Sequence, residues 1–137
     1  MAANSIHAGA VQIVCAIAWR GEQGTTSERL AKSLSTNPVV VRRVLKALEA
    51  HGLVSVRPGR HGGVELLRDP AEITLEDIYK AVEPDGGLFA LRERGNPRCP
   101  VNNAMSKALP PLFDAADAAV DGVLRRTRIA SLVEKIS

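Results

Sequence analysis

The sequence has 137 residues, enough for one hydrophobic core, and its 45% hydrophobic and 24% charged residues are typical of a soluble globular protein. Aromatic residues make up only 3%, which argues against a stacking platform for single-stranded nucleic acid. The net charge of +3 is unevenly placed: residues 1–68 contain nine Lys or Arg and four Asp or Glu, whereas residues 69–137 contain nine and eleven. The first half is therefore basic, as a DNA-binding half should be.

The first predicted element is an apolar helix within residues 6–18. Its apolar residues recur at helical spacing on one side and again on the opposite side, which predicts a helix that is buried on two sides. Cys15 is expected to be a small core residue, and His7 a surface or interface residue. Because the segment lacks a basic leader and is shorter than a membrane span, we expect no signal peptide, no transmembrane helix and a cytoplasmic protein.

Residues 25–53, TTSERLAKSLSTNPVVVRRVLKALEAHGL, predict two short helices joined by a tight turn. Thr25 and Glu28 have the spacing of a capping box at the start of the first helix. Asn37 is a suitable N-cap for the second helix, and Pro38 suits its first position because no amide hydrogen bond is lost there. Gly52 can adopt the left-handed conformation that ends the helix. The predicted buried stripe of the second helix consists of Val41, Val44, Leu45 and Leu48.

The opposite face of this second helix is polar and basic. Such a helix pair is a helix-turn-helix, in which the second helix, residues 38–51, enters the major groove of DNA. Its N-terminus would offer free amides to a phosphate, its arginines can reach guanine edges or the backbone, and its valines can contact a thymine methyl group. A solvated basic face, or a protein-interaction module, is the alternative. The candidate DNA-binding residues are Ser35, Thr36, Asn37, Val39, Val40, Arg42, Arg43 and Lys46.

A predicted β-hairpin follows. Residues 54–56 and 64–66 alternate in polarity and flank the glycine-rich segment RPGRHGG at residues 57–63. Arg57, Arg60 and His61 in this segment can enter a minor groove or contact phosphate. A plain hairpin whose charges serve solubility is the alternative. A basic wing directly after a basic helix favours DNA as the partner.

Residues 69–99 predict a linking helix and a loop. Asp69-Pro70 marks a boundary, and Thr74 can cap a helix that Pro84 ends. Residues 84–99 contain three glycines and two prolines and are therefore expected to form a loop.

Residues 100–126 return to helical spacing, although Pro110-Pro111 should kink or break the helix. Thr127 could cap a last short helix. The wide apolar stripe of residues 100–126 needs a partner surface, for which a symmetric dimer is the simplest source. That stripe consists of Leu112, Ala116, Ala119, Val120, Val123 and Leu124.

Taken together, these segments resemble the Rrf-two (Rrf2-type) family of bacterial winged helix-turn-helix transcription regulators over nearly the whole length. The residues that carry the resemblance are SERLAKSLSTNPVVVRRVLKALEAHGLV, the glycine-containing wing, and PAEITLEDIYKAVE. The resemblance implies a dimer formed through a long C-terminal helix and binding to roughly palindromic promoter DNA. Some members of the family sense redox state, nitric oxide or iron status through an iron–sulfur cluster, which three cysteines hold in the loop before that helix.

This chain departs from the cluster-binding pattern because its loop contains only Cys99. Two cysteines in all can form neither a disulfide framework nor a four-ligand zinc site. We therefore expect the cluster-free branch of the family, with no metal site and no cofactor; an atypical cluster using Cys99, His7 or a carboxylate across a dimer is the alternative. We expect Cys99 to be an inert cysteine near a helix start; a thiol sensor is the alternative, because neighbouring arginines and the helix start favour the thiolate.

The predicted fold is mainly α with a small β-wing: a winged helix-turn-helix in residues 1–68, a linking helix and sensor-type loop in 69–99, and C-terminal dimerisation helices in 100–137. The predicted function is a dimeric transcription regulator, a repressor, that recognises double-stranded DNA through residues 38–51 and 57–63 and does not bind membranes. An enzyme is not expected, because no nucleophile–base set, metal-ligand spacing or phosphate loop is present. The alternatives are a protein-interaction module without DNA binding and a redox-responsive regulator.

Overall fold

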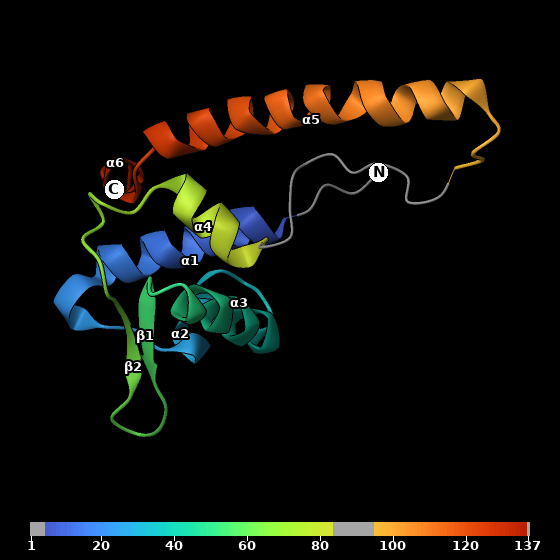
Figure 1. The fold of residues 1–137 in the computed structure, drawn as a ribbon. Coiled ribbons are helices and arrows are strands. Elements are labelled where there is room, and N and C mark those ends of the chain that lie inside the picture. Colours follow the sequence, from blue (N-terminus) through green and yellow to red (C-terminus); the bar gives the residue numbers. More distant parts are fainter. Residues whose placement is uncertain (1–4, 84–94, 137) are drawn as a thin grey trace.

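The computed structural model of the protein describes residues 5–83 and 95–136 (Figure 1). It confirms the predicted fold class, a mainly helical chain with one small antiparallel β-hairpin. The elements in chain order are α1 (Ile6–Arg20), the short 3₁₀ helix η1 (Gly21–Gln23), α2 (Ser27–Ser33), α3 (Pro38–Ala50), β1 (Val54–Arg57), β2 (Gly63–Leu66), α4 (Leu75–Val82), α5 (Pro100–Arg126) and α6 (Ile129–Val133).

The long helix α5 and the hairpin lie on opposite sides of the molecule (Figure 1). Helices α1 and α4 lie between them, and α4 contacts α1, α3 and α5. The helix-turn-helix pair α2–α3 and the hairpin therefore share the side that faces away from α5. Within the described parts of the chain, no helix is long and apolar enough to cross a membrane.

One hydrophobic core holds the elements together. All four residues predicted for the inner stripe of α3 are buried. The core extends to the C-terminus, because Ile129 of α6 is fully buried with residues of α1 to α4. The buried apolar residues are Ala10, Ile13, Val14, Ile17, Leu30, Ala31, Val41, Val44, Leu45, Leu48, Leu53, Val54, Val64, Ile73, Ile78, Ala81 and Ile129.

Most helix ends follow the local signals, with two corrections. Thr127, expected to cap the last short helix, is instead the C-cap residue of α5, and the N-cap of α6 is Arg128, which makes no side-chain capping hydrogen bond. The N-cap of α2 is Thr26, whose hydroxyl oxygen accepts a hydrogen bond from the Arg29 amide at 3.2 Å, and not Thr25. Thr25 is buried and pairs with Val64 of β2, so it adds a bridge to the hairpin. The tertiary pairing of Thr25 therefore moved the helix start by one residue.

Helix α5 runs without interruption through Pro110 and Pro111, where a kink or break was expected. Each proline removes one amide donor to a carbonyl four residues earlier, at Ser106 and Lys107. Both of these residues are exposed, so water can hydrate the two carbonyls. The loss of two donors on a solvated turn does not end the helix.

His7, expected at a surface or interface, packs its ring edge-to-face against Tyr79 of α4 with the ring centroids 5.2 Å apart. Both ring nitrogens are buried, and neither has a hydrogen-bond partner among the residues that the structure describes. Burial lowers the pKa of His7, while the negative charge of Glu83 partly opposes this shift. His7 is therefore neutral at pH 7.

The folded protein should lose stability as the pH falls below about 6.5, the ordinary pKa of histidine. The unfolded chain then binds a proton at His7 that the folded chain binds less readily, so acidification favours unfolding. Urea unfolding at pH 8 and at pH 5.5 measures this loss. In His7→Phe, which keeps a ring against Tyr79 but cannot titrate, the loss should be smaller. An equal loss in both proteins would contradict the assignment of the pH effect to His7.

Candidate nucleic-acid interface

The outer face of α3 is open to solvent and basic. Val39, with 63% of its surface exposed, Arg42, Arg43 and Lys46 are all exposed, on the side opposite the buried stripe. Val40, which is 37% exposed, lies at the edge of this face. Such a face matches a helix that enters a major groove, where arginines and lysines contact guanine or phosphate and small apolar groups contact thymine methyl groups.

A tight turn places the start of α3. Ser35 has the positive φ of 51°, which allows the chain to reverse between α2 and α3. Asn37 then caps α3, its side-chain oxygen accepting a hydrogen bond from the Val39 amide at 2.8 Å. Ser35, Thr36 and Asn37 are exposed beside this helix start, where a phosphate could be bound.

The first-turn amides of α3 are not free for a phosphate, contrary to the sequence-based expectation. Pro38 has no amide hydrogen, and the amides of Val40 and Val41 both donate to the Asn37 carbonyl, at 3.0 and 3.2 Å. The positive end of the helix dipole remains, but the hydroxyl and amide side chains of residues 35–37 are the available donors. Phosphate contacts here would therefore come from side chains.

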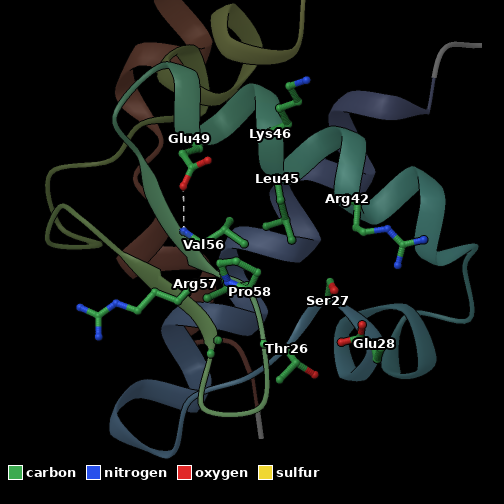
Figure 2. Close-up of a pocket in the computed structure, with 14 residues that line it drawn as sticks. Thr26, Ser27, Glu28, Arg42, Leu45, Lys46, Glu49, Val56, Arg57 and Pro58 are labelled. Atoms are coloured by element: carbon green, nitrogen blue, oxygen red, sulfur yellow. Dashed lines mark hydrogen bonds between the residues drawn. The ribbon is translucent and has the colours of Figure 1, made fainter.

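A groove of about 350 Å³ separates α3 from the hairpin. Figure 2 shows Arg42 and Lys46 on the α3 side of this groove and Arg57 on the hairpin side. Arg43 is not part of the groove lining and lies on the outer face of α3. The two neighbouring arginines therefore differ in their surroundings, because Arg42 lines the groove and Arg43 does not.

Two acidic residues in the groove, Glu28 and Glu49, were not among the predicted site residues. A hydrogen bond from its own backbone, with smaller contributions from Ser27 and Arg42 among others, lowers the pKa of Glu28. Glu49 accepts a hydrogen bond from the Val56 amide at 2.9 Å, which ties α3 to β1 (Figure 2). A carboxylate at such a position repels phosphate but can accept a hydrogen bond from the amino group of cytosine. Sequence spacing did not place either residue in the site, because Glu28 lies on α2 and Glu49 on α3, and only the tertiary fold brings both beside the hairpin.

The hairpin forms the predicted wing. Its strands pair from Val54 with Leu66 to Arg57 with Gly63, so that residues 58–62 make the tip. Gly62 is required there, because a Cβ atom at this position would clash with the Arg57 carbonyl oxygen. Arg57 forms an exposed ion pair with Glu65 at 3.5 Å. Such a pair is weak in water and can be exchanged for a phosphate contact.

A second hollow, of about 450 Å³, lies beside the wing. Arg57, Arg60 and His61 line it, as the predicted wing contacts, and Arg29 of α2 joins them although it was not predicted. These side chains form a basic surface next to the wing tip, suited to a phosphate backbone or a minor groove.

The two cysteines lie outside this surface. Cys99 is the half-buried N-cap residue of α5, and its expected inertness, like the alternative of a thiol sensor, stays a prediction. Cys15 is half-buried in α1, and burial raises the pKa of its thiol, as expected for a structural cysteine. His51 is the C-cap residue of α3, with its ring Nδ1 3.2 Å from the Ala47 carbonyl oxygen.

Comparison with known proteins places this architecture in a family. The model of the Rrf2 family, described as an iron-dependent transcriptional regulator, matches residues 4–135. The protein YwnA of Bacillus subtilis, which bears the name of an HTH-type transcriptional regulator, is 38% identical over 121 residues, covering 88% of this chain and 89% of its own length.

Solved structures agree with this placement. A crystal structure described as that of a DNA-binding protein is 32% identical and superimposes with a TM-score of 0.75 over 93% of this chain and 98% of its own. CymR, the global cysteine regulator of Bacillus subtilis, is 20% identical and shares the fold, with a TM-score of 0.71 over 100% of this chain and 99% of its own. The chain therefore belongs to the Rrf2 family of winged helix-turn-helix transcriptional regulators, which bind DNA and are not enzymes.

Proposed function

We propose that the protein is a dimeric, sequence-specific regulator that binds a roughly palindromic promoter site, where its presence would repress transcription. The single observation that carries this proposal is the side-by-side placement of the exposed basic face of α3 and the basic wing (Figure 2). This pair of surfaces fits one major groove and the minor groove next to it. The assigned contacts are Ser35, Thr36, Asn37, Val39, Val40, Arg42, Arg43, Lys46, Arg57, Arg60 and His61.

The surface of α5 supports the dimer. None of its residues is buried. Its inner side, with Ala116, Val120 and Leu124, is half-buried against the rest of the chain. Its outer side has an exposed apolar seam whose members are three or four residues apart, which is the pattern of a helix that pairs with another helix. The seam consists of Val101, Met105, Ala108, Leu112, Ala115, Ala119 and Val123.

A second copy of the chain is the simplest partner for this seam. The small residues Ala108, Ala115 and Ala119 allow two helices to approach closely, while Leu112 and Val123, 63% and 56% exposed, supply apolar area. A twofold axis that relates two copies of α5 also relates two copies of α3, and binding to two half-sites requires these to lie about 34 Å apart.

The iron named in the family description does not fit the donors of this chain. A cysteine-held cluster needs three or four thiolates or close substitutes, whereas the sequence has only Cys15 and Cys99. Within the described residues, no three His, Cys, Asp or Glu side chains lie together as a metal site. We therefore propose a regulator that does not use a cysteine-held iron–sulfur cluster.

Two measurements test the proposed function. Sedimentation of the purified protein should give the mass of a dimer, and selection from random double-stranded DNA should enrich two inverted half-sites about one helical turn apart. The logarithm of the association constant for the selected site should fall linearly with the logarithm of the salt concentration, because protein binding releases the cations condensed on the phosphates. A monomer, or a failure to enrich any DNA sequence, would contradict the proposal and leave the interaction module as the alternative.

A further inference from the structure

A charged contact joins α5 to the winged-helix body near the C-terminal end of α5. Arg125 donates two hydrogen bonds to one carboxylate oxygen of Glu76, from Nε at 3.1 Å and from Nη2 at 2.9 Å. Lys80, one turn along α4, lies 3.4 Å from the other carboxylate oxygen. The Glu76 side chain is only 13% exposed, whereas that of Arg125 is 65% exposed. The hydrogen bonds from Arg125 also lower the pKa of Glu76, so the carboxylate stays ionised at neutral pH.

This contact lies next to a backbone connection that fixes the end of α5. The Leu75 amide donates to the Thr127 carbonyl at 3.0 Å, and the Ile129 amide donates to the Ile73 carbonyl at 2.9 Å. Arg128 adds a side-chain hydrogen bond to the Ala71 carbonyl at 3.0 Å. These bonds set where α5 ends, but they lie beyond its last turn. The two charge-assisted hydrogen bonds from Arg125 act on the helix itself and resist its rotation and tilt relative to α4.

Helix α4 connects this contact to the DNA-binding surface. It packs against α3 as well as against α1 and α5, and Ile78 on α4 is fully buried in the common core. The orientation of α5 relative to α4 is therefore also its orientation relative to α3. The N-terminal half of α5 extends away from the body (Figure 1).

We propose that the Glu76–Arg125 contact is a positioning contact that determines which half-site spacing the dimer accepts. This inference rests on the proposed function, because it requires a dimer that pairs through α5. A small change in the angle of α5 at this contact displaces each recognition helix by an amount that grows with its distance from the contact. In a symmetric dimer the change occurs in both subunits. One added base pair moves the half-sites apart by about 3.4 Å and rotates one by about 35°, so a rigid dimer discriminates spacing.

The experiment measures the dissociation constants of the full-length protein on DNA duplexes whose two half-sites are separated in steps of one base pair. Wild type should prefer one spacing over its neighbours by about tenfold, equivalent to about 1.4 kcal/mol. In both Glu76→Gln and Arg125→Gln the ratio of the dissociation constants at the neighbouring and the preferred spacing should fall to about twofold. Affinity for a single half-site should not change, because the residues that contact DNA are untouched. Sedimentation confirms that each variant remains a dimer.

Arg126→Gln is the matched control. It removes the same charge from the neighbouring residue, and Arg126 forms no ion pair among the described residues. The control should keep the wild-type spacing ratio. If Arg125→Gln also keeps it while wild type has a sharp optimum, the positioning role is wrong and the proposed function stands. A wild-type protein without any spacing preference would overturn the dimeric function and this inference together.

Discussion

Replacing Arg42 and Arg43 together by alanine is expected to weaken binding to the selected operator by at least about 30-fold. An arginine that contacts a base edge contributes about 1–3 kcal/mol, and two such contacts at the lower limit amount to about 2 kcal/mol. Both side chains are exposed on α3, and neither forms an ion pair within the described parts of the chain. Their loss should therefore leave the melting temperature within a few degrees of wild type.

Fluorescence anisotropy at a fixed salt concentration measures this loss, and Arg126→Ala combined with Lys135→Ala is the control. Both control residues are exposed cations outside α3 and the wing, so the net charge changes equally and operator affinity should remain near that of wild type. Comparison of the operator with a scrambled duplex separates the two roles. If the arginines contact base edges, their loss reduces the preference for the operator over the scrambled duplex. If they contact phosphates, their loss lowers the affinity for both duplexes and reduces the slope of affinity against salt. Unchanged operator binding would contradict the assignment of α3 as the recognition helix.

Leu112→Glu is expected to convert the dimer into a monomer and to weaken operator binding by more than about 100-fold. Leu112 is 63% exposed in the single chain, so a glutamate there costs the monomer little. In a dimer that pairs through the α5 seam, two carboxylates would be buried close together, which costs several kcal/mol unless they are neutralised. The affinity falls because only a dimer binds both half-sites: once one subunit is bound, the other meets its half-site at a high effective concentration, and a monomer lacks this second contact.

Sedimentation at several protein concentrations measures the change in mass, and the control is Ser106→Glu. Ser106 is exposed on α5 but lies away from the seam, so the same carboxylate should leave the dimer and its affinity intact. The far-ultraviolet circular dichroism of both variants should match wild type. A dimeric Leu112→Glu protein would show that α5 does not pair through this seam.

Local sequence signals were sufficient to predict a helix end wherever capping residues close to that end determine it. Asn37 and Pro38 begin α3, and Gly52, with a φ of 71°, follows its end, where the Leu53 amide donates to the Leu48 carbonyl at 3.0 Å. Thr74 and Asp77 cap α4 with a reciprocal pair of hydrogen bonds. These features depend on residues within one turn of each other, which is why the sequence alone predicts them.

Contacts between distant residues account for what the sequence did not show. The wide stripe predicted for residues 100–126 is two faces: Ala116, Val120 and Leu124 turn inward, while Leu112, Ala119 and Val123 turn outward. Periodicity shows that a helix is apolar around much of its circumference, but only packing decides which side its own chain covers. Residues 84–94 of the predicted loop lie outside the described residues, and the division at residues 68 and 99 stays a prediction.

The sequence by itself determined the order of the helices, the buried stripe of α3, the basic wing and the family, because all of these depend on residues close together in the chain. Tertiary structure decided that Thr25 pairs with Val64 instead of capping α2, and that Glu28 and Glu49 share a groove with Arg42. It also decided that Glu76 meets Arg125, 49 residues further along the chain. Residues so far apart leave no periodic pattern, since only the packing of the core fixes the distance between them.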